Sequence, residues 1–243
     1  TMEDVPESLV EYQEVNVEGS KNLALQASAA GVKRFIYLSS IKVLGETTTS
    51  QSPFTESSMV SPVGAYACSK LQAEDVLRDI SAETGMELVI IRPPLVYGPG
   101  VKANFRSIIK LSETYFPLPF SSVCNKRSMI YLSNLVDFII RCIHHPVAAN
   151  QTFLVSDGQD VSLKELITEL RSAMGRKPGL IPMPVSLFRF LGKLTGKADF
   201  IDRLVGDLQV DSSRARRLLG WAPPYTFEQG IKETVDDYIK RKK

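Results

Sequence analysis

Two short, continuously apolar segments constrain the fold more than any other feature of this sequence. "RFIYLSS" (34–40) and "ELVIIRPP" (87–94) each carry an unbroken run of aliphatic or aromatic residues, which is typical of strands buried on both faces. Between them, residues 65–84 are rich in helix formers and end at Gly85. This order of strand, helix and strand predicts two parallel neighbours in a doubly wound α/β sheet.

The remaining sequence predicts a long helix before this unit and a mixed region after it. The helix covers residues 8–32, where good helix formers end at a glycine. After Tyr97 the sequence is richer in Pro and Gly, and short helices alternate with short strands. Ser162 and Glu165 have the spacing of a capping box. Expected helices begin near Asn104, Asn134, Leu163, Val185 and Thr226, and expected strands cover 128–132 and 151–156.

Composition argues against several classes of function. The chain has 243 residues, 44% of them hydrophobic and 23% charged, as in an ordinary soluble globular protein. Its net charge of +2 is spread along the chain, so we expect neither nucleic acid nor a membrane as a partner. Three separated cysteines without a CxxC motif, and no apolar run of membrane length, favour a reducing cytoplasm. The adjacent His144 and His145 do not predict a metal site.

A tyrosine and a lysine four positions apart, Tyr66 and Lys70, lie at the start of the predicted helix 65–84. Residues at this spacing share a helix face, so the lysine cation can favour the phenolate and lower the pKa of the tyrosine. The same spacing recurs at Tyr238 and Lys242 in the terminal helix, where nothing chemical surrounds it. Spacing alone therefore leaves two interpretations open: a catalytic pair, or a half-buried tyrosine beside a surface lysine.

Ser40 gives the pair a chemical context. It ends the first buried strand, 26 residues before Tyr66, and open α/β sheets bind ligands at the carboxyl ends of their strands. Tyr66 can remove the proton of a substrate alcohol while Ser40 donates a hydrogen bond to the same oxygen. The hydride that leaves the adjoining carbon needs an acceptor that no amino acid supplies, which indicates a nicotinamide cofactor.

Four blocks of the sequence, in order, resemble the extended short-chain dehydrogenase/reductases, a group that includes the NAD-dependent epimerase/dehydratase family. They are "FIYLSSIKVLGE", "PVGAYACSKLQAEDVL", "VIIRPPLVYGPG" and "RSMIYLSNLVDFI", and they are most similar to the UDP-galactose 4-epimerase-like enzymes. The resemblance implies the C-terminal part of a Rossmann-type doubly wound parallel sheet and a smaller mixed α/β substrate-binding domain. Residues 1–97 would form the partial dinucleotide-binding domain. Residues 98–243 would mainly bind the nucleotide sugar, with about 128–160 returning to the sheet.

The resemblance also implies roles for individual residues. Ser40, Tyr66 and Lys70 would be the catalytic residues, and Lys70 would also bind the ribose of the nicotinamide. The other cofactor-binding residues implied are Asn16, Ser39, Pro93, Pro94 and Leu95. An alternative that stays open is that the two prolines only end the strand.

On the substrate side, the resemblance implies that Asn104 and Phe105 contact UDP. Arg127 and Arg203 would hold the diphosphate, for which planar guanidinium groups are suited, and a surface ion pair is the alternative for each. The expected enzyme acts at C4 of a UDP-hexose or UDP-N-acetylhexosamine as a UDP-sugar 4-epimerase. The alternatives are a UDP-4-keto-sugar reductase or dehydrogenase, and a non-catalytic dinucleotide sensor or scaffold. In relatives the helices corresponding to 3–30 and 65–84 pair across a dimer, so we expect a homodimer.

One departure from the family concerns the cofactor. The family begins with a strand, a Gly-rich turn and a helix that bind the dinucleotide. Here the only formal match, "GPGVKA" (98–103), comes too late in the chain. Three strand-helix units, roughly 80 to 90 residues, are missing by this comparison. We therefore expect a fragment that is inactive alone and exposes an apolar sheet edge, with NAD as the cofactor of the complete protein and NADP not excluded.

Overall fold

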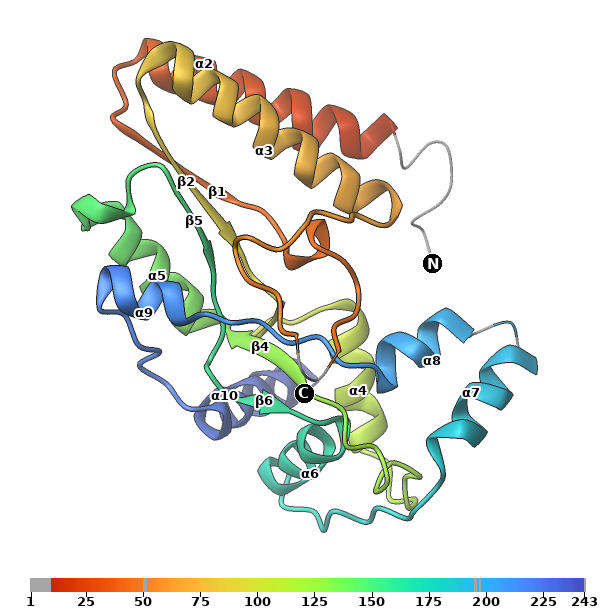
Figure 1. The fold of residues 1–243 in the computed structure, drawn as a ribbon. Coiled ribbons are helices and arrows are strands. Elements are labelled where there is room, and N and C mark those ends of the chain that lie inside the picture. Colours follow the sequence, from red (N-terminus) through yellow and green to blue (C-terminus); the bar gives the residue numbers. More distant parts are fainter. Residues whose placement is uncertain (1–9, 50–51, 195, 197, 243) are drawn as a thin grey trace.

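The structure, a computed structural model, describes residues 10–49, 52–194, 196 and 198–242 (Figure 1). Residues 3–9 of the expected dimer helix lie outside this set. A parallel sheet has the strand order β1-β2-β5. Its strands are β1 (Arg34–Leu38), β2 (Glu87–Arg92) and β5 (Gln151–Leu154). The two strands predicted from their apolar runs are thus confirmed as parallel neighbours, and Ile36 pairs with Val89.

Two long helices cover one face of this sheet (Figure 1). The first runs from Val10, includes a π-helical segment (Gln13–Glu18) and continues as α2 (Gly19–Ala29). The second is α3 (Gly64–Thr84), which ends at Gly85 in a left-handed conformation (φ 74°) that glycine adopts without strain. Both predicted helices are confirmed, and the π-helical segment was not foreseen. The apolar residues that pack between these helices and the sheet include Val17, Ala24, Tyr37, Ala73, Leu77, Leu88 and Ile90.

The other face of the sheet is covered by α5 (Leu132–His144) and α9 (Ser213–Leu219). Val89 and Ile91 point to this face because side chains alternate along a strand. Phe138 of α5, Phe153 of β5 and Trp221 pack against them. Helices on both faces explain why the strands are apolar throughout rather than alternating.

A second, mixed sheet joins β3 (Leu95–Tyr97), β4 (Arg127–Tyr131) and β6 (Asp160–Val161). β3 and β4 are parallel, and β6 is antiparallel to β4. Among residues 128–160, β5 therefore pairs with β2, whereas β4 belongs to this second sheet. The α/β class with a parallel sheet and a smaller mixed part is confirmed. The remaining elements are α4 (Ala103–Ser112), α6 (Leu163–Ala173), α7 (Val185–Leu194), α8 (Ala198–Val205), α10 (Phe227–Lys240) and two 3-10 helices (Ile41–Val43 and Pro146–Ala148).

Local sequence signals explain where several of these helices begin. The predicted capping box is present at α6, where Ser162 accepts from the backbone N–H of Glu165 and the glutamate accepts from the N–H of Ser162. Thr226 and Gln229 form a second capping box at α10. None of the helices in the described part of the chain has the length and apolar character needed to cross a bilayer.

Candidate active site

The site begins where β1 and β2 end. The backbone N–H of Ser39 donates to the carbonyl of Ile91 (2.8 Å), and that of Ile41 donates to the carbonyl of Pro93 (3.0 Å). Ser40 caps the 3-10 helix after β1, where its hydroxyl accepts a hydrogen bond from the N–H of Lys42 (3.3 Å). These bonds bring the predicted residues Ser39, Ser40 and Pro93 together at the carboxyl end of the sheet.

Lys70 fastens the start of α3 to the same place. Its ammonium group donates to the carbonyl oxygen of Leu38 (3.0 Å) and lies 4.8 Å from the centre of the Tyr37 ring. Burial lowers the pKa of Lys70, and the nearby Glu74 carboxylate acts in the opposite direction. Burial also raises the pKa of Tyr37 to about 12, so its ring faces the cation as a neutral phenol.

Tyr66 lies one helical turn before Lys70 and is half-buried. Its ring meets the ring of Tyr12 edge to face, with centroids 5.6 Å apart. The hydroxyl of Ser69 donates to the Tyr66 carbonyl (2.9 Å) and accepts from the side-chain amide of Asn16 (3.0 Å). Asn16 therefore braces the backbone of Tyr66 through Ser69.

A buried ion pair holds α3 against β2. Arg92 donates twice to Glu74, from Nε to Oε1 (2.8 Å) and from Nη2 to Oε2 (2.5 Å). Arg78 adds a third bond to the same carboxylate (2.9 Å). Burial opposes ionisation of Glu74, but Arg92 prevails and lowers its pKa. Because Glu74 is one turn beyond Lys70 and Arg92 precedes Pro93, this pair sets the position of the face of α3 that carries Lys70.

Sequence analysis missed these supporting residues. Glu74 stands four positions after Lys70, within a block that the resemblance covers, and its spacing puts it on the Lys70 face of the helix. A charge on that partly buried face is a signal that could have identified it. Nothing in the local sequence singles out Tyr12, Tyr37 or Ser69, because their contacts join separate elements.

The two arginines predicted on the substrate side meet in the structure. Nη1 of Arg127 donates to the backbone carbonyls of Arg203 (2.6 Å) and Gly206 (3.1 Å). Burial lowers the pKa of Arg127, and the carboxylates of Asp207 and Glu46 counteract this effect. Arg203 forms an ion pair with Glu46 through Nε (3.0 Å).

The structure does not bring Phe105 to this place. Its side chain is buried in the core of the second sheet and stacks on Tyr97, with ring centroids 5.7 Å apart. A ligand contact by Phe105 would therefore have to use its backbone. The side chain of Asn104, the other residue predicted in this segment, lies outside the described residues.

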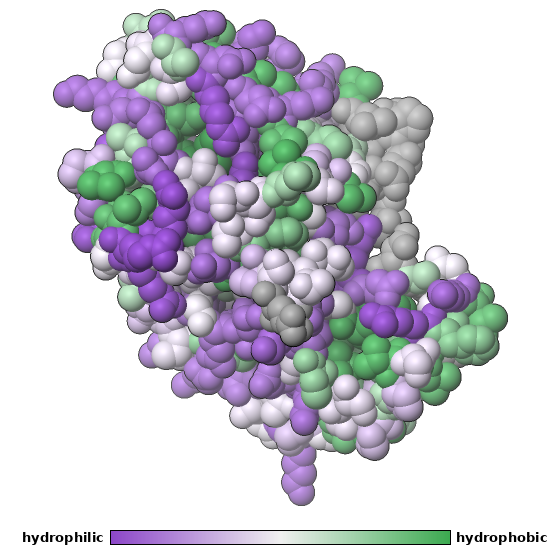
Figure 2. Space-filling view, viewed as in Figure 1, coloured by the Kyte–Doolittle hydropathy of each residue, from purple (hydrophilic) through white to green (hydrophobic). Residues whose placement is uncertain are grey.

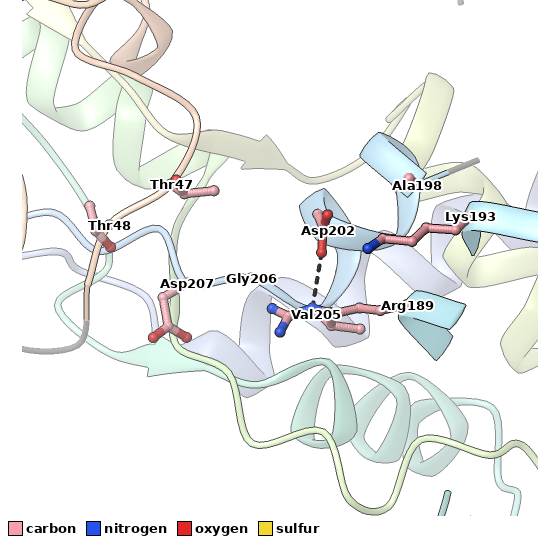
Figure 3. Close-up of a pocket in the computed structure, with 9 residues that line it drawn as sticks. All are labelled: Thr47, Thr48, Arg189, Lys193, Ala198, Asp202, Val205, Gly206 and Asp207. Carbon is pink, nitrogen blue, oxygen red and sulfur yellow. Dashed lines mark hydrogen bonds and ion pairs between the residues drawn. The ribbon is translucent and has the colours of Figure 1, made fainter. Parts of the chain in front are cut away.

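A cavity of about 670 Å³ is lined by residues that flank Arg203 in the sequence (Figure 3). Asp202, before Arg203, and Thr47, after Glu46, contribute to its walls. Arg189 and Lys193 of α7 supply positive charge, and Arg189 forms an ion pair with Asp202 (3.0 Å). The complete lining is Thr47, Thr48, Arg189, Lys193, Ala198, Asp202, Val205, Gly206 and Asp207. In the described portion of the chain, no three His, Cys, Asp or Glu side chains cluster as metal ligands would.

Several known proteins are similar to this chain in sequence or in fold. The model of the NAD dependent epimerase/dehydratase family matches residues 3–156. UDP-glucose 4-epimerase of Vibrio cholerae is 49% identical over 235 residues, which are 96% of this chain and 72% of that protein. RMD from Pseudomonas aeruginosa with NADPH has a TM-score of 0.75 at 22% identity, covering 98% of this chain and 78% of that one. UDP-glucose 4-epimerase from Thermotoga maritima with UDP-glucose has a TM-score of 0.73 at 22% identity, covering 95% of this chain and 71% of that one.

These matches define an α/β enzyme of a dinucleotide-dependent class. The chain belongs to the NAD dependent epimerase/dehydratase family, as the four sequence blocks predicted. The residues at the ends of β1 and β2 fit the nicotinamide end of such a cofactor. Lys70 and Ser40 carry polar groups that a ribose could contact, whereas Ser39 is buried, and the exposed apolar side chains of Leu38 and Leu95 suit a flat ring.

Proposed function

We propose that the complete protein interconverts C4 epimers of a UDP-hexose or UDP-N-acetylhexosamine, with NAD as its cofactor. The observation that carries this proposal is the bond from Lys70 to the carbonyl of Leu38. It supports the proposal because it ties the face of α3 that carries Tyr66 and Lys70 to the end of β1, which Ser40 follows. The 49% identity to a UDP-glucose 4-epimerase supports the substrate class.

In the proposed mechanism the side chains of this chain move a proton at the C4 hydroxyl. Tyr66 takes the proton, Lys70 stabilises the phenolate by its charge, and Ser40 donates a hydrogen bond to the same oxygen. NAD, held by residues such as Lys70 at the ends of β1 and β2, would supply the acceptor and donor for the C4 hydride. Epimerisation then requires the 4-keto sugar to turn over within the site, so that the hydride returns to its other face.

We assign Arg127, Arg203 and the adjoining cavity to the diphosphate of the substrate. Arg127 is held in place by backbone carbonyls, and its guanidinium group has further N–H donors that a phosphate can use. Arg203 forms an ion pair with Glu46 in the structure, so the diphosphate would have to displace this carboxylate from the guanidinium group. Arg189 and Lys193 add positive charge to the same cavity.

We assign the cofactor side to Asn16, Ser39, Pro93, Pro94 and Leu95, together with Tyr66 and Lys70. The complete protein would add the Gly-rich turn that binds the pyrophosphate and separates NAD from NADP. Apolar side chains on α5 support this view, since Val136, Ile140 and Ile143 are exposed along one stripe, as expected where a further layer packs. The chain of 243 residues alone would then have no measurable turnover.

We further propose a homodimer in the cytoplasm. Val15 and Leu23 are exposed on the first helix, which lies beside α3 (Figure 1). Exposed apolar side chains on a helix pair are typical of a subunit interface. The described cysteines are free, which suits a reducing compartment.

The proposal is tested with the protein expressed from its complete coding sequence. It is incubated with NAD or NADP and a panel of UDP-hexoses and UDP-N-acetylhexosamines, and the products are followed by proton NMR. We expect interconversion of one epimer pair, with Ser40→Ala reducing kcat and leaving the circular dichroism spectrum unchanged. Accumulation of a 4-keto or reduced product without an epimer would instead identify a reductase or dehydrogenase. No reaction with any sugar would refute both the epimerase and the reductase or dehydrogenase interpretation.

A further inference from the structure

Helix α7 carries apolar side chains that neither the core nor the cavity explains. Leu187, Phe190 and Leu194 are 42%, 58% and 68% exposed. Their spacing of three and four residues places them along one stripe of the helix. Phe188 and Gly192, on another side of α7, are buried. The exposed stripe is therefore a second apolar face, in addition to the face that packs on the protein.

A neighbouring segment extends this face. Tyr115 and Phe116 are 90% and 78% exposed. Their segment pairs with the chain that leads into α7, because the N–H of Leu118 donates to the carbonyl of Gly179 (2.9 Å) and the N–H of Ile181 donates to the carbonyl of Leu118 (2.9 Å).

Aromatic contacts join the two segments further. Phe120 stacks on Phe188, with ring centroids 5.3 Å apart, and the guanidinium of Arg176 lies 4.2 Å from the centre of the Tyr115 ring. Figure 2 shows hydrophobic side chains gathered at the end of the molecule that carries α7 and α8. We call the following residues the apolar surface: Tyr115, Phe116, Ile181, Leu187, Phe190 and Leu194.

Basic residues outnumber acidic residues among the described charges near the apolar surface. Arg176, Lys177, Arg189 and Lys193 belong to its segments, whereas Glu113 stands just before Tyr115 and Phe116 in the chain. Over the whole chain the two signs nearly balance, with 29 basic and 27 acidic residues. The net charge of the whole chain, which argued against a membrane as a partner, therefore hides a local excess of basic residues. Asp202 of α8 reaches this region and pairs with Arg189.

We propose that the apolar surface binds the face of an anionic lipid bilayer, with α7 lying along the headgroup region. Phe and Leu on one side of a helix and Lys and Arg on another are typical of helices that lie in a membrane interface. Two copies of this surface placed face to face would instead bring like charges together. Arg189 and Lys193 also line the cavity, so membrane binding would hold the cavity beside the headgroups. This inference is independent of the proposed reaction.

The test is co-sedimentation of the complete protein with vesicles. Vesicles of phosphatidylethanolamine and phosphatidylglycerol are compared with vesicles of phosphatidylcholine, at low and high salt. We expect binding to the anionic vesicles that weakens as salt screens the charges. The double substitution Phe190→Ser with Leu194→Ser should lower the partition coefficient at least about tenfold, because two apolar side chains no longer enter the interface. Lys177→Glu should lower it at least about fivefold.

Matched controls come from elsewhere on the surface. Val147→Ser with Ile239→Ser removes exposed aliphatic side chains outside the apolar surface, and Lys232→Glu reverses an exposed charge on α10. Both controls should bind the vesicles as the parent does. No sedimentation, equal binding to both vesicle types, or binding that the two test variants leave unchanged would overturn the proposal. So would an oligomer in lipid-free solution that Phe190→Ser with Leu194→Ser dissociates, since the surface would then join copies of the chain. If that double variant does not fold, Lys177→Glu and the salt series decide the outcome.

Discussion

The substitution Glu74→Gln tests how helix α3 is held on the sheet. Glu74 is fully buried and Arg92 is nearly so, and two hydrogen bonds join them. Removing one charge of such a pair leaves the other uncompensated in a low dielectric, at a cost of about 3–5 kcal/mol. The amide can still accept a bond from Arg92, so we expect a loss at the lower end, about 3 kcal/mol. For a chain of this size, that lowers the Tm by about 6–12 °C.

Thermal unfolding followed by circular dichroism and urea unfolding measure this loss on the complete protein. The matched control is Asp75→Asn, which removes the ion pair to Arg78 at the exposed surface (3.2 Å) and should cost less than about 1 kcal/mol. Replacing both buried partners, as Glu74→Leu with Arg92→Met, should restore much of the lost stability because no buried charge is left unpaired. A Glu74→Gln protein as stable as its parent would refute this account of α3.

The same residue sets a pH dependence. The pKa of Glu74 is lower in the folded chain than in the unfolded chain. Its contribution is therefore complete above the unfolded pKa, about 4.3, and is lost as pH falls through the folded pKa. In Glu74→Gln this part of the loss of folding stability at acid pH should disappear, so that the free energies of unfolding of parent and variant converge at low pH. Parallel stability curves down to low pH would contradict the assignment.

Three further predictions concern single residues. Asn16→Ala, which removes the brace on the Tyr66 backbone, should lower kcat more than it changes the KM for the sugar, and equal changes in both would argue against a positioning role. Arg203→Ala should raise KM for the UDP-sugar while kcat falls less, as expected of a group that binds the diphosphate, and steady-state kinetics would show an unchanged KM if the assignment is wrong. Ser162→Ala removes the capping box of α6 and should cost about 1 kcal/mol, or about 2–4 °C in Tm, with Ser186→Ala as an exposed control for the thermal scan.

Local patterns sufficed to predict the main elements. A few consecutive residues were enough to predict each of these features: the apolar runs of β1 and β2, the glycine that ends α3 and the capping box of α6. The elements that were missed are β3, β6, α8 and α9. Each has eight residues or fewer, so a helical or alternating pattern has little length over which to show itself. The π-helical turns before α2 lie against α3, a tertiary contact that a periodic pattern does not contain.

The site shows the same division between local and tertiary information. Tyr66 and Lys70 were predicted as site residues from their spacing together with the place of Ser40 after an apolar strand and the resemblance of the surrounding blocks to the family. The contacts that hold them were missed because the partners are distant in sequence: Glu74 bonds Arg92, and Asn16, predicted only as a cofactor-binding residue, bonds Ser69. Phe105 shows another limit, since the side chain of a residue predicted to contact the ligand lies in the core, which leaves only its backbone for such a contact. An aromatic residue at a helix start has the same appearance in sequence whether it packs inward or meets a ligand.

The central claim is that Tyr66, Lys70 and Ser40 handle the proton of a C4 alcohol while the C4 hydride leaves and returns. It is tested most directly with UDP-glucose deuterated at C4, incubated with the complete protein and NAD and followed by NMR. We predict UDP-galactose that retains the deuterium at C4, with Tyr66→Phe reducing the rate at least about a hundredfold and leaving the fold intact. Loss of the deuterium to solvent, or a Tyr66→Phe protein as fast as the parent, would contradict the claim.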